Sequence, residues 1–218
     1  MGKNIKIFES DSDLLVYLPA FGDEGKEVHD FLKEYDCPDH TLIVINELDW
    51  DNELSPWKAE PVFKGEPPFG GGGDRFLLEL TQKIMPEVES GLKVKPKKRY
   101  ISGYSLAGLF AIYSLYKTDI FFGASSASGS LWFPGFQEFA MENEMKRRPE
   151  SIYFSLGDRE SRSRNPLMRK VGEKTEALEK YYESLGIRTT FEMNPGNHFM
   201  DSGKRTAKGI SWILNSEK

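Results

Sequence analysis

The sequence of 218 residues has a single cysteine, Cys37, and a formal net charge of −5 at pH 7. One cysteine cannot form a disulfide within the chain, which fits a reducing compartment such as the cytoplasm. The negative net charge disfavours a nucleic-acid partner, because such partners are bound through their phosphates by an excess of lysine and arginine. We therefore expect a cytoplasmic protein that binds no nucleic acid.

Long hydrophobic runs are also absent. No stretch approaches the roughly 20 apolar residues that span a bilayer. The first ten residues, MGKNIKIFES, have neither the apolar run nor the small-residue cleavage site of a signal peptide. No set of histidine, cysteine and acidic residues has the spacing of a zinc site. The sequence therefore predicts no membrane association and no metal site.

What the sequence does contain is an alternation of short apolar runs with helical patterns. Several runs are almost continuous in apolar residues, as strands buried on both faces of a sheet are. The predicted strands are residues 5–8, 14–18, 41–46, 99–102, 121–125, 151–156 and 188–192. Strands that alternate with helices predict an α/β fold with a mostly parallel central sheet and helices on both faces. The length favours one domain over residues 1–218.

Helix boundaries can be read at two places. Asp74 follows four glycines and can cap a helix whose apolar residues extend to Val88. Asn165 followed by Pro166 is a typical helix start, and Gly186 marks the end of that helix, where a left-handed residue is wanted. A third apolar stripe at helical spacing predicts a C-terminal helix over residues 207–214.

The strongest functional signal lies at residues 99–108, RYISGYSLAG. A predicted strand ends at Gly103, and an apolar helix begins after Ser105. This is the pattern of a nucleophile elbow, in which the serine occupies a strained corner and small residues, here Gly103 and Ala107, let strand and helix pass closely. The pattern predicts that Ser105 is a nucleophile and that the N–H of Leu106, at the helix start, stabilises the oxyanion.

His198 is the best candidate for the base. It lies after the last predicted strand and before the last helix, and the chain order expected in this fold is serine, acid, histidine. His29 lies on an early predicted helix, and His40 precedes a strand at its amino end. His198 is therefore the histidine expected to reach Ser105.

The acid should follow the strand at residues 151–156. Asp158 and Glu160 both lie there, and either could orient His198 and stabilise its imidazolium. Spacing alone leaves both open, together with the alternative that they are surface carboxylates paired with Arg159 or Arg162.

Residues 47–73 fit neither a helix nor a strand pattern. They include three large aromatics and four prolines. Loops of this length are usually functional, so the segment could wall the substrate cleft, with Trp50 in contact with substrate. The alternative is a surface loop held down by its aromatic side chains.

Four segments together resemble one branch of the α/β-hydrolases. They are the elbow, SGSLWFP at residues 128–134, GDRE at 157–160 and GNHF at 196–199. In these segments the chain is similar to the putative-esterase branch, which is close to the esterase D and trilactone-siderophore esterase group. The resemblance implies an α/β-hydrolase fold, favours Glu160 over Asp158 as the acid, and implies that Trp132 lies near the acyl site.

The chain departs from that group in two places. The elbow ends in Ala107 where glycine is commoner, and the loop after the second strand, residues 19–25, lacks the His-Gly pair that many relatives carry. The second oxyanion donor is therefore an open choice between the N–H groups of Ala20 and Phe21.

The predicted function is serine-dependent hydrolysis of a small-molecule carboxylic ester, without a cofactor. The cleft is expected to be open, without a large lid domain, and Tyr104 is a further candidate for substrate contact. Siderophore esters, feruloyl-type esters and short acyl esters all fit the pattern. Two alternatives are a related acyl chemistry (thioesterase, acyltransferase or peptidase) and a catalytically silent binding domain that keeps the fold.

Overall fold

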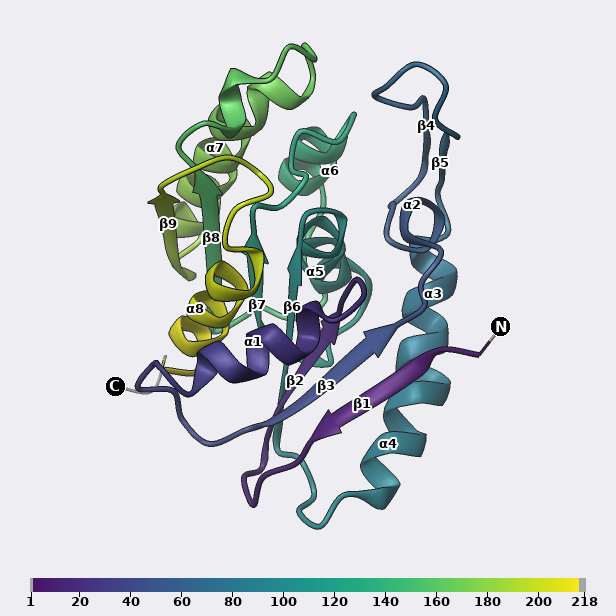
Figure 1. The fold of residues 1–218 in the computed structure, drawn as a ribbon, viewed down its shortest axis with the longest axis vertical. Coiled ribbons are helices and arrows are strands. Elements are labelled where there is room, and N and C mark those ends of the chain that lie inside the picture. Colours follow the sequence, from purple (N-terminus) through teal and green to yellow (C-terminus); the bar gives the residue numbers. More distant parts are fainter. Residues whose placement is uncertain (1, 216–218) are drawn as a thin grey trace.

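A seven-stranded sheet forms the centre of the computed structural model, which describes residues 2–215. In spatial order its strands are β1 (Asn4–Phe8), β3 (Thr41–Asn46), β2 (Leu14–Pro19), β6 (Lys98–Tyr104), β7 (Phe121–Ala127), β8 (Ser151–Gly157) and β9 (Arg188–Asn194). β1 runs antiparallel to β3, and the other neighbours pair in parallel (Figure 1). The predicted mostly parallel sheet is confirmed, and each predicted strand is present with an end moved by at most two residues.

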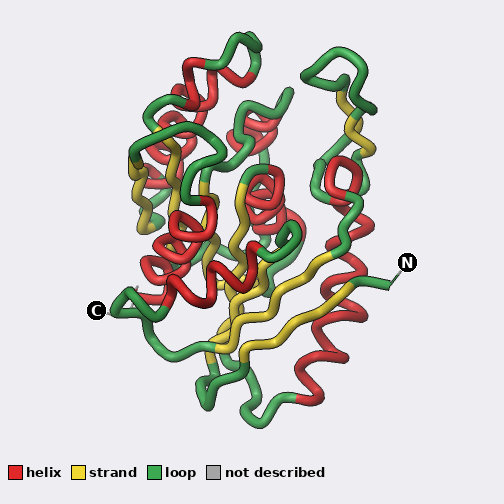
Figure 2. Tube along the Cα trace, viewed as in Figure 1, coloured by secondary structure: helices red, strands yellow, loops and turns green. Residues whose placement is uncertain are grey.

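Helices cover both faces of the sheet, as Figure 2 shows. The helices α1 (Glu24–Leu32) and α8 (Ser202–Leu214) pack against each other on one face. Further helical segments include α3 (Gly73–Glu79), the π-helical η1 (Leu80–Ile84), α4 (Met85–Gly91), α5 (Leu106–Lys117), α6 (Phe136–Glu142) and α7 (Val171–Ser184). Within residues 2–215, no helix combines the length and the apolar character that crossing a membrane requires.

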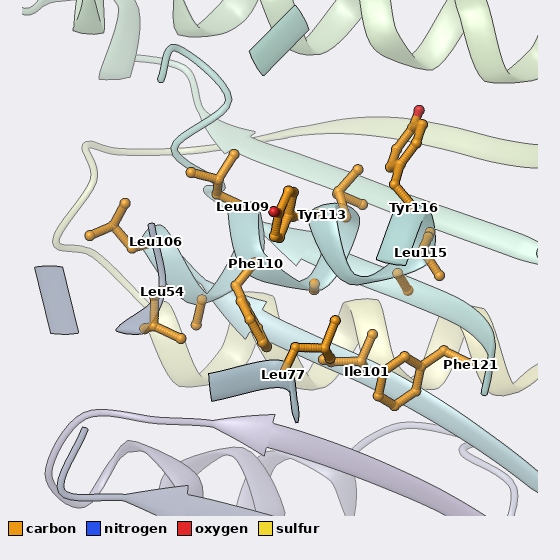
Figure 3. Packing of buried hydrophobic residues seen from close by; sticks show 14 of the residues in the cluster. Leu54, Leu77, Ile101, Leu106, Leu109, Phe110, Tyr113, Leu115, Tyr116 and Phe121 are labelled. Atoms are coloured by element: carbon orange, nitrogen blue, oxygen red, sulfur yellow. The ribbon is translucent and has the colours of Figure 1, made fainter. Parts of the chain in front are cut away.

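The alternation of side chains along the strands creates two cores. Val16 and Leu18 of β2 pack under α1 and α8, whereas Leu15 and Tyr17 of the same strand belong to the larger core on the opposite face. That larger core surrounds α5, which is buried from its first residue to Tyr116. A helix that is apolar all round is a buried helix. Figure 3 shows it packed against Leu54, Leu77, Ile101 and Phe121.

The start of α3 differs from the prediction. Gly72, not Asp74, holds the N-cap position, and no side chain among the described residues caps this helix. Asp74 lies in the first turn, where its carboxylate accepts a hydrogen bond of 2.6 Å from the Tyr113 hydroxyl and pairs with Lys117 at 3.1 Å. The prediction of an Asp74 cap was wrong, because the carboxylate has stronger partners on α5 than the backbone of its own helix.

The second predicted helix start is present. The side-chain oxygen of Asn165 accepts the backbone N–H groups of Leu167 and Met168, at 2.9 and 3.3 Å. The first turn is a 3₁₀ helix, η3 (Met168–Lys170), and α7 continues from it. At the other end Gly186 has a φ of +71°, the left-handed conformation expected there.

Residues 47–73 contain more regular structure than the sequence predicted. A short helix, α2 (Trp50–Glu53), is followed by a two-stranded hairpin of β4 (Lys58–Ala59) and β5 (Phe69–Gly70). Trp57 anchors the hairpin: its indole N–H donates to the carbonyl oxygen of Pro134 at 2.9 Å, and its ring packs on Phe136 of α6. Strands of two residues are too short to show a period in the sequence, and only this packing reveals them.

Candidate active site

Ser105 occupies a sharp corner between β6 and α5. Its φ of +57° is rare for a residue with a side chain. The corner is held on both sides, since the Ser105 N–H donates to Ala127 at 3.2 Å and its carbonyl oxygen accepts the N–H of Ser130 at 3.0 Å. A Cβ at Gly103 would collide with the backbone of Ala107. The small residues and the strained serine are therefore where the elbow pattern predicts them.

Gly103→Ala tests the close passage of strand and helix. The methyl group meets backbone, which cannot turn aside, so we expect a loss of about 3 kcal/mol in the free energy of unfolding, in line with overpacked cores. Urea unfolding followed by circular dichroism measures this loss. The matched control is Gly91→Ala at the end of α4, where an added Cβ meets nothing within 4 Å. There we expect no loss and a gain of up to about 1 kcal/mol; an equal loss in both variants would contradict the prediction.

His198 lies between β9 and α8, and its imidazole links the two other predicted side chains. Nε2 is 3.0 Å from Oγ of Ser105, and Nδ1 is 2.7 Å from Oε2 of Glu160. The hydroxyl of Tyr104 donates to the backbone oxygen of His198 at 2.7 Å and so holds its segment against the end of β6. The imidazole is 24% exposed, which leaves the site open to a ligand.

The structure brings Glu160, and not Asp158, to the histidine. Glu160 begins the short 3₁₀ helix η2 (Glu160–Arg162), and its side chain is 5% exposed. The carboxylate of Asp158 is 53% exposed, accepts the N–H of Gly196 at 2.9 Å and lies 3.8 Å from Arg159. Asp158 therefore fixes the turn that carries His198, whereas Glu160 contacts the imidazole itself.

The surroundings of Glu160 favour its charged form. Burial acts to raise its pKa, but the hydrogen bond from His198 and the charge of its imidazolium, with the N–H of Gly157 at 2.6 Å and the hydroxyl of Ser128 at 2.8 Å, outweigh burial. The pKa of Glu160 is therefore held below its usual value. A carboxylate that is ionised at neutral pH can orient a neutral imidazole and stabilise the imidazolium that forms from it.

Three backbone N–H groups were predicted as candidates for the oxyanion hole, and the structure shows which of them have a partner. The N–H of Leu106 is the first of α5, where backbone donors lack a partner within the helix. The N–H of Ala20 is already bonded to Ile45 at 3.0 Å, so it is not free to act. The N–H of Phe21 makes a long contact of 3.5 Å to the carboxylate of Glu24. Between Ala20 and Phe21, the structure therefore favours Phe21.

The three predicted substrate contacts differ in their accessibility. Trp132 is buried against Phe69 and belongs to the core that surrounds α5. Tyr104 is also buried, and burial raises the pKa of its hydroxyl to about 12, so it stays protonated and donates to the His198 backbone. Trp50 is half-buried and packs edge to face with Phe21, whose side chain is 72% exposed. Trp50 and Phe21 thus form an accessible aromatic surface.

Three side chains at the site were missed in the sequence. Ser128 and Ser130 follow β7 and contact Glu160 and Ser105, with hydroxyl distances of 2.8 and 3.4 Å. Arg205 of α8 also reaches the carboxylate of Glu160. The sequence does contain a pattern that indicates a buried Arg205. Residues 205, 209 and 213 are four apart, so Arg205 lies on the same helix face as Gly209 and Ile213, and this face is buried.

The side chains of Ser105, His198 and Glu160 form a path along which a proton can move, and the Glu160 carboxylate can balance the positive charge that a proton gives to His198. The path leads from the hydroxyl of Ser105 to Nε2 of His198, with the carboxylate of Glu160 against the opposite ring nitrogen. Within residues 2–215, no group of three or more histidine, cysteine or acidic side chains could hold a metal ion.

Comparison with known structures gives the same fold. The siderophore hydrolase EstA from Aspergillus nidulans superposes with a TM-score of 0.75 at 19% identity, over 99% of this chain and 91% of EstA. The IroE-like serine hydrolase from Shewanella oneidensis also superposes with a TM-score of 0.75, at 17% identity, over 98% of this chain and 80% of that hydrolase. The fold is therefore that of the α/β-hydrolases.

Sequence comparison identifies the family. The chain is 24% identical to the protein YbbA of Bacillus subtilis (strain 168) over 189 residues, which are 83% of this chain and 76% of YbbA. Residues 17–198 match the family described as "Putative esterase". This match includes the Ser105 corner, Glu160 and His198, and it spans most of the chain, which therefore belongs to the "Putative esterase" family.

Proposed function

We propose that this protein is a serine esterase that hydrolyses a small-molecule carboxylic ester through Ser105, His198 and Glu160. The observation that carries the proposal is the continuous chain of hydrogen bonds, 3.0 Å from Ser105 to His198 and 2.7 Å from His198 to Glu160. In the sequence His198 is 38 positions from Glu160 and 93 positions from Ser105. In the structure the three side chains meet with the atoms that acyl transfer requires.

In the first half of the reaction, Nε2 of His198 takes the proton of the Ser105 hydroxyl as Oγ attacks the ester carbonyl carbon. The carbonyl oxygen becomes negative and is held by the N–H groups of Leu106 and Phe21. His198 then gives its proton to the leaving alcohol, the ester C–O bond breaks, and an acyl-enzyme remains on Ser105. Glu160 holds the ring in the required tautomer throughout.

The second half repeats these steps with water. His198 takes a proton from a water molecule, whose oxygen attacks the acyl carbon. When the tetrahedral intermediate collapses, the bond to Oγ breaks and the proton returns to Ser105. The products are one carboxylic acid and one alcohol, and the enzyme is restored. Neither half needs a cofactor.

For the substrate we propose an ester with a flat or aromatic group close to the scissile bond. The exposed ring of Phe21 and the half-buried ring of Trp50 lie on the loop and the helix that follow β2 and β3, and Phe199, next to His198, is 90% exposed. Aromatic faces favour flat apolar groups. A siderophore ester is the first substrate to assay, because EstA is named as a siderophore hydrolase.

Reaction with a serine-directed fluorophosphonate tests the proposal without knowledge of the substrate. We expect wild type to gain one phosphonate group on Ser105, measured by intact mass and peptide mapping, and His198→Ala to react at least about a hundredfold more slowly. Ser105→Ala is the control and should gain none. A folded wild type that neither reacts with the probe nor hydrolyses p-nitrophenyl acetate would overturn the proposal in favour of a silent binding domain.

A further inference from the structure

Arg205, on the first turn of α8, places a guanidinium group behind the candidate acid. Its side chain is 2% exposed. Nη1 lies 3.2 Å from Oε1 of Glu160, 3.0 Å from the hydroxyl of Ser128 and 3.3 Å from the hydroxyl of Tyr104. Nη2 donates to the carbonyl oxygen of Pro195 at 2.9 Å. A buried arginine with this many partners is held in one place.

The partners of Arg205 come from the ends of four neighbouring strands of the sheet. Tyr104 ends β6 and bonds to the backbone of His198, Ser128 follows β7, and Pro195 belongs to the segment that leads from β9 to His198. The chain leaves room for the guanidinium at Gly157, where an added Cβ would lie 3.0 Å from both Nη atoms. Arg205 therefore ties the acid and the segment of the base to the same point.

Charge gives the arginine a second effect. Glu160 is 5% exposed and its carboxylate accepts the N–H of Gly157 and the hydroxyl of Ser128, and a buried anion also needs a compensating charge. His198 must be neutral to act as a base, so it cannot supply that charge in the resting state. Among the described residues, the ion-pair partners of Glu160 are His198 and Arg205. The permanent charge of Arg205 therefore balances the carboxylate while the imidazole is neutral.

We propose that Arg205 is a positioning residue of the active site: it fixes Glu160 and the His198 segment, and its permanent charge balances the Glu160 carboxylate. The inference rests on the proposed function for the roles of His198 and Glu160. Arg205 is not a catalytic residue, because Glu160, Ser128 and Tyr104 lie between it and the reacting atoms.

The sign of the pH effect follows from the charges that face the pair. Arg205 opposes the addition of a proton to the His198–Glu160 pair. From α1, the carboxylate of Glu24 also interacts with His198, although burial raises its own pKa above the usual value. When Arg205 is lost, the His198–Glu160 pair is easier to protonate. The acid limb of the pH profile, which is the rise of kcat/KM with pH on its acidic side, should therefore move to higher pH. For charges a few ångströms apart, a move of about one pH unit is expected.

Arg205→Met and Arg205→Lys separate the two effects, with p-nitrophenyl acetate as the substrate. In Arg205→Met we expect kcat/KM to fall about a hundredfold and the acid limb to move up by about one unit. In Arg205→Lys, which keeps the charge but cannot reach all four partners, we expect a fall of about tenfold with the acid limb near its wild-type position.

Lys208→Met is the control, since Lys208 lies on the same helix and pairs with Glu192, which is not in contact with Ser105, His198 or Glu160. It should stay within about twofold of wild type.

Two outcomes would overturn the inference. One is a folded Arg205→Met with kcat/KM and acid limb unchanged; the other is a loss of rate without any movement of the acid limb, which indicates a purely structural role. If Arg205→Met does not fold, Arg205→Lys decides: a kcat equal to wild type contradicts the positioning role.

A readout independent of turnover separates this inference from the proposed function. The chain has three histidines, so the ring resonances of His198 can be assigned by their loss in His198→Ala and followed by NMR over pH. In Arg205→Met the titration midpoint of His198 should rise, whether or not the protein hydrolyses an ester. If wild type fails to react with the fluorophosphonate, the proposed function fails. If the midpoint stays or falls in Arg205→Met, the role of Arg205 fails.

Discussion

Ser105→Ala is expected to lower kcat/KM for p-nitrophenyl acetate by about 10³–10⁴-fold. The change removes the only hydroxyl that bonds to Nε2 of His198 among the described residues, while alanine leaves the helix start and its N–H groups in place. The residual rate should come from substrate binding and the oxyanion donors. Initial rates at saturating and subsaturating ester measure the loss, and circular dichroism checks that the variant is folded.

The matched control is Ser102→Ala, three residues earlier on β6. The Ser102 hydroxyl is fully buried and has no hydrogen-bond partner among residues 2–215. Its removal should leave kcat/KM within about twofold, and it should not lower the free energy of unfolding, because an unsatisfied buried polar group is lost. A comparable loss of rate in both serine variants would contradict a nucleophile at position 105.

Glu160→Gln should have the second largest effect, a fall in kcat of about 10³–10⁴-fold. An amide has no charge to stabilise the imidazolium, and its NH₂ group can hold the ring in the wrong tautomer against Nδ1 of His198. Asp158→Asn is the matched comparison, two residues away in the same loop. Because Asp158, within the described residues, accepts a hydrogen bond only from the backbone of Gly196 and faces Arg159, the kcat of Asp158→Asn should fall by less than about tenfold.

The same assay ranks the two carboxylates directly. Both variants are compared with wild type for kcat, KM and thermal unfolding, because the loss of a buried carboxylate leaves Arg205 without its anion. A larger fall in Asp158→Asn than in Glu160→Gln would make Asp158 the acid and would require this loop to rearrange when substrate binds.

Much of the fold could be predicted because its signals are local. Each strand of the sheet was visible as an apolar run, and the end of α7 at Gly186 was visible as a left-handed position after a helical stripe. The corner at Ser105 was visible for the same reason, since the small residues Gly103 and Ala107 are sequence neighbours of the strained serine. The hydrophobic period of a strand or helix and the residue types of a turn depend on a few neighbouring residues. Both can therefore be seen directly in a sequence.

The failures of prediction share the opposite cause. Asp74 was expected to cap its own helix, but Tyr113 and Lys117 of α5 compete for its carboxylate. The hairpin near Trp57 was missed because its strands are stabilised by contact with α6 and not by their own pattern. In both cases a partner far along the chain outweighs the local preference, and no local pattern encodes that partner.

The sequence by itself determined the class of the fold, the corner at Ser105 and the choice of His198 among three histidines, because each depends on residue order and spacing. Spacing left Glu160 and Asp158 both open, and the resemblance favoured Glu160. The tertiary structure brings Glu160 to His198, since the direction of the loop that carries both carboxylates is set by packing. Only it placed Arg205 behind Glu160, 45 residues away in the sequence, and Tyr104, 101 residues from Arg205, in the same network. Contacts of that separation exist only once the sheet has brought the ends of its strands together.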